Sequence, residues 1–133
     1  SLGRKLLTHV RDVMRSGDAV PRVPPEMPLV DMMREMTRKG LGATAVVTPE
    51  GQVAGIFTDG DLRRLIERGA DLRELRARDV LYPTPKTVRA DALAVDAADL
   101  MEKHRITSVL VIDDDGLLVG ALNSNDLMRA KVI

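Results

Sequence analysis

The chain has 133 residues, and its 20 basic and 20 acidic side chains cancel to a formal net charge of zero. This balance excludes a global field that would steer the surface toward nucleic acid or a membrane, and a single Phe and a single Tyr exclude an aromatic base-stacking platform. The absence of cysteine excludes a disulfide framework, thiolate catalysis and cysteine-ligated zinc.

Residues 1–17 are predicted to form a linker and a leading helix. The sequence begins with Ser1 and not with Met, and we interpret it as a piece of a longer protein. No apolar run approaches the roughly 18 residues of a membrane span, and no signal peptide precedes the leading helix. We therefore expect a cytoplasmic protein.

The segment 18–69 is predicted to contain a short extended piece at 20–23, a helix, two strands and a second helix. The first helix is indicated by apolar residues at the i, i+3, i+4, i+7 spacing of one helical face: Leu29, Met32, Met33 and Met36. Two β-rich runs follow at 43–47 and 53–57, with Gly51 in a turn that needs positive φ. The last helix is expected to begin after Thr58.

The same order returns 65 residues later, in the segment 85–133, after a predicted linker at 70–84. Its parts are an extended piece at 87–88, a helix with Ala94, Ala97, Ala98 and Met101 on one face, strands at 108–112 and 117–122, and a helix after Asn123. Glycines and acids match in unbroken register between the copies. We infer a duplication of the α+β class, in which two repeats related by a pseudo-twofold axis bury each other's sheets.

This β-α-β-β-α duplication resembles the tandem CBS motif pair, or Bateman module, and the stretch Gly55 to Asp61 carries the closest match. The resemblance extends from about Val10 to Ala130. It implies a regulatory module that binds a nucleotide in the cleft between two repeats, CBS motif 1 at 18–69 and CBS motif 2 at 85–133. It implies no catalytic residue and no cofactor within the chain.

A narrower resemblance is to the C-terminal half of D-arabinose 5-phosphate isomerases. The segments that carry it are Leu2–Leu7, Val10–Met14, Gly55–Arg64, His104–Val109 and Asp126-Leu127. Members of that family carry an N-terminal sugar isomerase (SIS) domain, an aldose–ketose isomerase that supplies Kdo and lipopolysaccharide synthesis. The resemblance therefore implies that this chain begins just after the catalytic domain.

Thr58 and Asp61 are the leading candidates for ligand contact. Thr58 offers a hydroxyl beside a helix N-terminus, where unpaired N–H groups attract phosphate, and Asp61 offers a carboxylate to two ribose hydroxyls. The same Thr-x-x-Asp spacing is also a capping box, in which each side chain satisfies the other's backbone donor. Both roles stay open, because one does not exclude the other.

At the corresponding place in the second repeat, Asn123 and Asp126 depart from the pattern, because Asn replaces the hydroxyl residue. Asn is an equally good N-cap, so the helix start is expected to survive. The lost hydroxyl weakens the case for an ordinary adenosine phosphate. It indicates an empty site or one adapted to another ligand.

The family pattern also implies which residues form the walls of the cleft. They are Val20, Pro21 and Arg22 with Gly42, Ala43, Thr44 and Ala45, and Lys86, Thr87 and Val88 with Thr107, Ser108 and Val109. Candidate anion partners are Arg38, Lys39, Arg63, His104 and Arg105, although each is also typical of a solvated helix end. No metal site is predicted, since Asp113-Asp114-Asp115-Gly116 lacks the glutamate of a calcium loop and is interpreted as a hairpin turn.

The resemblance implies a nucleotide-type effector, and our first hypothesis is feedback inhibition by CMP-Kdo, with AMP or another adenosine nucleotide as the alternative. A purely structural module with empty clefts, which dimerises its parent, is the rival from another class. A homodimer through the CBS faces, and a tetramer of the parent together with its SIS domain, are expected under either hypothesis. Independent enzymatic activity is disfavoured, because no nucleophile or acid–base constellation is present.

Overall fold

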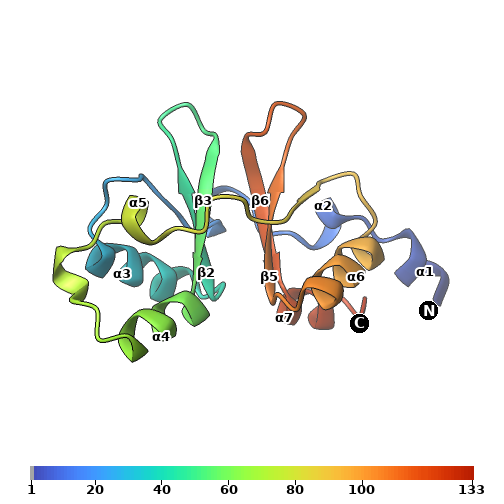
Figure 1. The fold of residues 1–133 in the computed structure, drawn as a ribbon. Coiled ribbons are helices and arrows are strands. Elements are labelled where there is room, and N and C mark those ends of the chain that lie inside the picture. The colour runs from blue at the N-terminus through green and yellow to red at the C-terminus, as the bar shows by residue number, and fades with distance from the viewer. Residues whose placement is uncertain (1) are drawn as a thin grey trace. The chain divides into compact units, whose positions relative to one another are not determined.

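The computed structural model describes residues 2–133, which divide into two compact units. The first-repeat unit is Val20–Pro85, and the second-repeat unit combines residues 2–19 with Lys86–Ile133. Each unit contains one helix–strand–strand–helix repeat (Figure 1). The α+β class and the internal duplication predicted from the sequence are therefore confirmed.

The first-repeat unit is built on a three-stranded sheet of order β1-β2-β3. Its elements are β1 (Arg22–Val23), α3 (Leu29–Lys39), β2 (Ala43–Val47), β3 (Val53–Thr58), α4 (Asp59–Glu67), η2 (Leu72–Glu74) and α5 (Ala77–Val80). Strand β1 runs parallel to β2, and β2 runs antiparallel to β3. The parallel pair requires the crossover through α3, because a hairpin can join only antiparallel strands.

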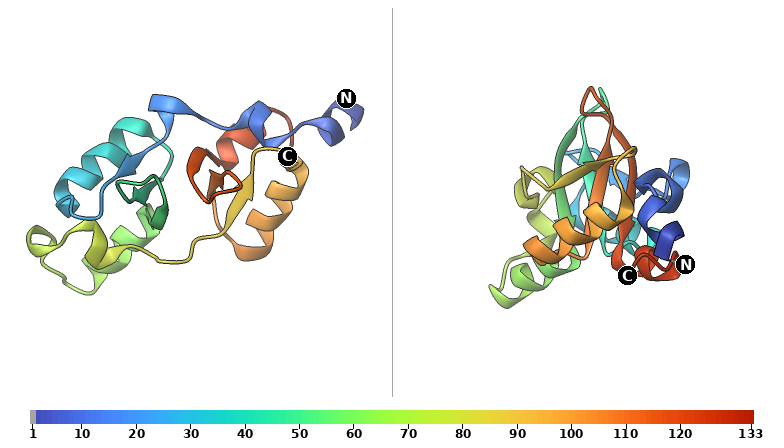
Figure 2. Two further views of the ribbon diagram at one scale, coloured as in Figure 1. Left: turned by 90° about the horizontal axis from the view of Figure 1, so that it is seen from above. Right: turned by 90° about the vertical axis from the view of Figure 1, so that its right-hand side faces the viewer.

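The second-repeat unit repeats this topology with the sheet order β4-β5-β6. Its elements are α1 (Leu2–Leu7), α2 (Val10–Val13), η1 (Gly17–Ala19), β4 (Thr87–Arg89), α6 (Ala94–His104), β5 (Ser108–Ile112), β6 (Leu118–Asn123) and α7 (Ser124–Arg129). Residues of α1 and α2 contact α6, and Figure 2 gives two further views of these N-terminal helices, in blue. The longest helices, α3 and α6, have 11 residues each. Across residues 2–133, no helix reaches the length and apolarity of a bilayer span.

The predicted helical faces form the cores of the two units. Leu29, Met32 and Met36 of α3 are buried against Val46 and Phe57 of the sheet. Ala94, Ala97 and Met101 of α6 occupy the corresponding place against β5 and β6. The methionine stripe is therefore core packing and not an exposed binding groove.

The hairpin turns also match their prediction, with one shift. Gly51 and Gly116 both have positive φ, +89° and +80°. The second strand of the later hairpin was predicted to begin at Leu117 and begins at Leu118, because the Leu117 N–H donates to the Asp113 carboxylate in the turn, at 2.9 Å. The same carboxylate accepts from the Asp115 N–H, so Asp113 is used to shape the turn.

A segment from outside each repeat crosses the last strand of the sheet. Tyr82 exchanges two backbone hydrogen bonds with Ile56 of β3, at 2.8 and 3.0 Å, and Arg15 does the same with Ala121 of β6, at 2.8 and 3.1 Å. A Cβ atom on Gly55 would lie 2.5 Å from the Tyr82 carbonyl oxygen, and one on Gly120 would lie 2.9 Å from the Arg15 carbonyl oxygen. Glycine is required at both positions because backbone passes where a side chain would be.

Gly55→Ala should destabilise the chain by about 1–3 kcal/mol, because the added methyl meets backbone and must push the crossing segment aside. Urea unfolding followed by circular dichroism measures this loss. The matched control is Gly3→Ala in α1, where a Cβ meets no atom within 4 Å, and it should leave stability unchanged or slightly raised. An unaltered midpoint for Gly55→Ala would contradict the packing argument.

Candidate functional site

The strand–helix junction of each unit carries the residues singled out from the sequence. We call Thr58 and Asp61, at the β3–α4 junction, the first corner. The Thr58 hydroxyl oxygen accepts from the Asp61 N–H at 3.1 Å, and the Thr58 N–H donates to Asp61 Oδ2 at 3.0 Å. This reciprocal pair is a capping box, so the capping role is confirmed, and ligand contact stays a prediction.

We call Asn123 and Asp126, at the β6–α7 junction, the second corner. Asn123 Oδ1 accepts from the Asp126 N–H at 2.9 Å, and the Asn123 N–H donates to Asp126 Oδ2 at 3.0 Å. The amide oxygen thus replaces the hydroxyl without loss of the cap, as the N-cap preference of Asn predicts. What the replacement removes is a hydroxyl, not the helix start.

The predicted wall residues of the first corner meet at one edge of the β1-β2-β3 sheet. Ala43 pairs with Thr58 across β2 and β3, and Ala45 pairs with Arg22 across β1 and β2. The Ala45 N–H donates to the Pro21 carbonyl at 3.1 Å, which adds the 20–22 segment to the same edge. Val20, Pro21 and residues 43–45 are buried, whereas the side chain of Arg22 is exposed.

The second corner gathers its predicted wall residues in the same way. Ser108 pairs with Asn123, and Thr87 pairs with Leu110 two residues further along β5. The Ser124 N–H donates to the Thr107 carbonyl at 2.9 Å, which fixes the loop before β5 against the start of α7. Val109 is buried, whereas the Lys86 side chain, just before β4, is exposed.

The candidate anion partners differ in whether their side chains form an ion pair within the described residues. Arg38 and Lys39 both form ion pairs with Glu35, and contact of either side chain with an anion stays a prediction. Arg63 and Arg105 are exposed, and within residues 2–133 neither forms an ion pair. Arg105 has φ +54°, at the helix C-cap where the first repeat has Gly40 with φ +67°.

The partners of the two corner carboxylates were missed by sequence reasoning. Asp126 forms an ion pair with Arg15 through Nε at 3.0 Å and Nη2 at 3.2 Å, and another with Arg129 one turn along α7. Asp61 forms an ion pair with Arg64 one turn along α4. The i, i+3 spacing indicates the two intrahelical pairs. Nothing in the spacing of Arg15 and Asp126, 111 residues apart, indicates theirs.

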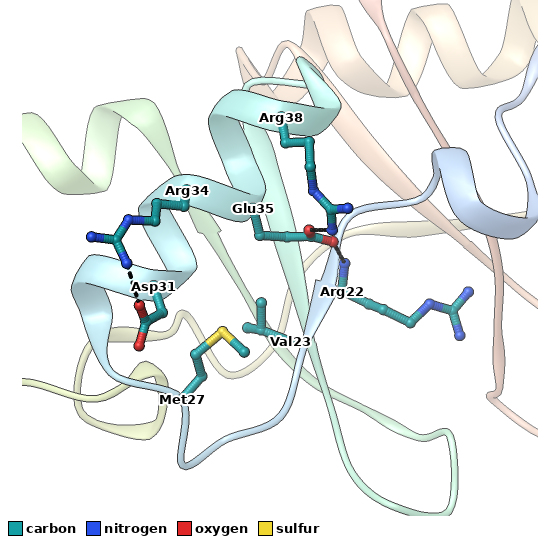
Figure 3. A pocket seen from close by; sticks show the side chains of 7 residues that line it. All are labelled: Arg22, Val23, Met27, Asp31, Arg34, Glu35 and Arg38. Carbon is teal, nitrogen blue, oxygen red and sulfur yellow. Dashed lines mark hydrogen bonds and ion pairs between the residues drawn. The ribbon is translucent and has the colours of Figure 1, made fainter.

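A groove of about 400 Å³ lies on the first-repeat unit between β1 and α3 (Figure 3). Its lining is Arg22, Val23, Met27, Asp31, Arg34, Glu35 and Arg38. Arg34 pairs with Asp31, and Arg38 pairs with Glu35, while the Arg22 guanidinium points away from both acids (Figure 3). Its charges are therefore largely matched internally, and none of its seven residues is aromatic, so it is a weaker nucleotide site than the corners.

Comparison with known proteins identifies CBS domains and relatives among arabinose 5-phosphate isomerases. The family model of the CBS domain matches twice, at residues 10–68 and 77–133. The arabinose 5-phosphate isomerase KdsD of Pseudomonas aeruginosa is 48% identical over all 133 residues, in its C-terminal region, and the chain spans 41% of the length of that relative.

Solved structures share the fold. The structure of CBSX2 in complex with AMP has a TM-score of 0.81 and 25% identity, over 94% of this chain and 96% of that chain. An uncharacterized conserved protein from Pyrococcus horikoshii has a TM-score of 0.83 and 23% identity, over 95% of this chain and 93% of that chain. The second likeness concerns the fold alone.

Arg15→Ala should lower the free energy of unfolding by about 2 kcal/mol, because it removes the bidentate partner of the Asp126 carboxylate, whose side chain is only 6% exposed. Arg64→Ala is the matched control, since it removes the partner of Asp61 from a pair whose side chains are 65% and 25% exposed. That change should cost about 0.5 kcal/mol or less. Equal losses in urea unfolding of the two variants would show that burial does not distinguish these ion pairs.

Proposed function

Because the chain belongs to the CBS-domain family, we propose that it is the ligand-sensing regulatory module of an arabinose 5-phosphate isomerase. The observation that carries the proposal is the 48% identity to such an isomerase over the whole chain. The two CBS matches occupy most of this chain. We therefore assign the aldose–ketose isomerisation, and its place in Kdo and lipopolysaccharide synthesis, to the SIS domain of the parent protein.

The first corner supplies the chemistry that a nucleotide would use. Asp61 is acceptor-only when ionised, so it suits the paired hydroxyl donors of a ribose. The capping box holds this carboxylate in place before any ligand arrives, and preorganisation of this kind reduces the entropy lost on binding. The small buried residues 43–45 beside it leave backbone within reach of a base.

An anionic part of the effector would meet Arg22. This side chain is exposed at the edge of the sheet that carries Thr58, and its guanidinium is turned away from the two acids of the neighbouring groove (Figure 3). A guanidinium matches the geometry of a carboxylate or phosphate. We favour CMP-Kdo as the effector, a feedback inhibitor whose cytidine would use the corner and whose acidic sugar would use the cation.

An adenosine nucleotide is the second candidate. The observation that favours it is the complex of CBSX2 with AMP, a protein 25% identical to this chain with a TM-score of 0.81. The intact Thr58 and Asp61 pair fits the ribose of AMP as well as that of a cytidine nucleotide. The two candidates differ in the base and in what lies beyond the phosphate, and the acidic sugar of CMP-Kdo is the part that Arg22 would contact.

The effector would act by shifting an equilibrium between two arrangements of the parent protein. A ligand can bias such an equilibrium only by its differential affinity for the two states. We propose a cytoplasmic protein whose CBS pair forms a homodimer, within a tetramer of the parent, and which transmits ligand binding to its own SIS domain. Exposed apolar side chains on α3 and α4, Val30 and Ile66, are available for such contacts.

A thermal-shift comparison of CMP-Kdo, CMP, AMP and ATP tests the proposal on this chain. A ligand present at about 100 times its Kd adds roughly 2.7 kcal/mol, which raises the Tm of a domain of this size by several degrees. We expect CMP-Kdo to give the largest shift. Shifts with the adenosine compounds alone would replace feedback inhibition by adenosine sensing. Flat curves for all four would favour a structural module that binds no nucleotide.

Arg22→Gln should weaken CMP-Kdo binding by roughly tenfold, which is about 1.4 kcal/mol, through loss of one charge-assisted contact. Isothermal titration calorimetry of the variant measures the change. Arg34→Gln is the matched control, because Arg34 lines the same groove but is paired with Asp31 at 2.8 Å. If both variants lose affinity equally, a general charge effect and not a contact with Arg22 is responsible.

A further inference from the structure

The two corners look alike in sequence but differ in how many donors reach the carboxylate. Asp126 Oδ2 accepts from the Asn123 N–H and from Arg15 Nε, both at 3.0 Å. Asp126 Oδ1 accepts from Arg15 Nη2 at 3.2 Å and from Arg129 Nη2. A carboxylate has about four acceptor sites, so these four donors fill Asp126.

By comparison, only about half of the acceptor sites of the Asp61 carboxylate are occupied. Its Oδ2 accepts from the Thr58 N–H at 3.0 Å, and its Oδ1 accepts from Arg64 Nη2 at 2.6 Å. Residues 2–133 supply no further hydrogen bond to this carboxylate, so about two acceptor sites remain. The side chain of Asp61 is 25% exposed, against 6% for Asp126, so a ligand can reach these sites.

The difference comes from one residue on each crossing segment. Arg15 and Tyr82 hold equivalent positions, because each exchanges two backbone hydrogen bonds with the middle of the last strand in its unit. Arg15 is long and cationic, and its guanidinium forms a bidentate pair with the corner carboxylate. Tyr82 is neutral, and its side chain is largely exposed. The segment that carries Arg15 thus closes the second corner, whereas the segment that carries Tyr82 leaves the first corner open.

Resting on the proposed function, we infer that the chain binds one effector molecule, read at the Asp61 corner, and that Arg15 permanently occupies the place of the ribose hydroxyls at the Asp126 corner. A ribose at the second corner would have to displace a guanidinium from a buried carboxylate. Each hydroxyl bond that it formed would have one charged partner where the guanidinium bond has two, and the bidentate ion pair of Arg15 with a buried carboxylate would be lost. Occupation of the first corner requires no such exchange.

Calorimetric titration of the whole chain with CMP-Kdo and with AMP tests this inference. We expect one site per chain in the wild type, at least a tenfold loss of affinity in Asp61→Asn, and a change within about twofold in Asp126→Asn. The Asp126 variant should still show a lower Tm, because it weakens a buried ion pair. Two sites per chain, or a loss of affinity confined to Asp126→Asn, would overturn the inference and leave the proposed function standing. If neither compound binds the wild type, the proposed function and the inference both fail.

Transfer of the arginine provides a second test that does not depend on the stability of the Asp126 variant. Tyr82→Arg places a guanidinium at the position from which Arg15 closes the other corner, and it should reduce affinity at least tenfold. Tyr82→Gln is the matched control, since it removes the phenol without adding a charge, and it should retain affinity within about twofold. Unchanged affinity in Tyr82→Arg would contradict closure of a corner by an arginine at this position.

Discussion

A reciprocal pair of hydrogen bonds joins the last strand of each unit to the helix that follows it, and the position of the corner carboxylate depends on this pair. The residue that ends the strand, Thr58 or Asn123, caps the helix, and the aspartate three residues later returns the hydrogen bond to the strand. Such a cap contributes about 0.5–2 kcal/mol. Its larger consequence is geometric, since it fixes an acidic side chain at the edge of the sheet where the first two strands also begin.

The units keep this junction in common and differ in what crosses the sheet beside it. Gly55 and Gly120 let a neighbouring backbone carbonyl lie where a Cβ atom would clash with it, so both units accept an additional segment against the last strand. In one unit this segment carries Tyr82, and in the other it carries Arg15. A duplicated fold can therefore become asymmetric through different residues at equivalent positions of its two CBS matches, while α3 and α6 each still pack against their own sheet.

Burial explains why the Arg15–Asp126 ion pair is harder to separate than the Arg64–Asp61 ion pair. Where Arg15 meets Asp126, both side chains are mostly shielded from water, so the charges are costly to separate. Where Arg64 meets Asp61, water screens the pair, so a competing donor can share the carboxylate at little cost. The proposed regulatory role needs both properties, because a sensor requires one carboxylate that can exchange partners and a scaffold that does not rearrange when it does so.

The sequence by itself determined the repeat, the order of helices and strands, and the start of the last helix in each copy. These are local properties, expressed in the apolar spacing from Leu29 to Met36, the glycines in the turns and the capping residues Thr58 and Asn123. The ion pair of Arg38 with Glu35, three residues earlier, is also a local property that the spacing of the two residues indicates, although we did not predict it.

Only the tertiary structure decided which corner carboxylate is open. Arg15 and Asp126 are 111 residues apart, and no periodic pattern relates them. They meet because the backbone at Arg15 hydrogen-bonds to β6. This pairing, and not the residues next to Arg15 in the sequence, determines where the Arg15 side chain lies. Local sequence encodes caps and turns through the short reach of the backbone, whereas contacts between distant segments exist only after the sheet has formed.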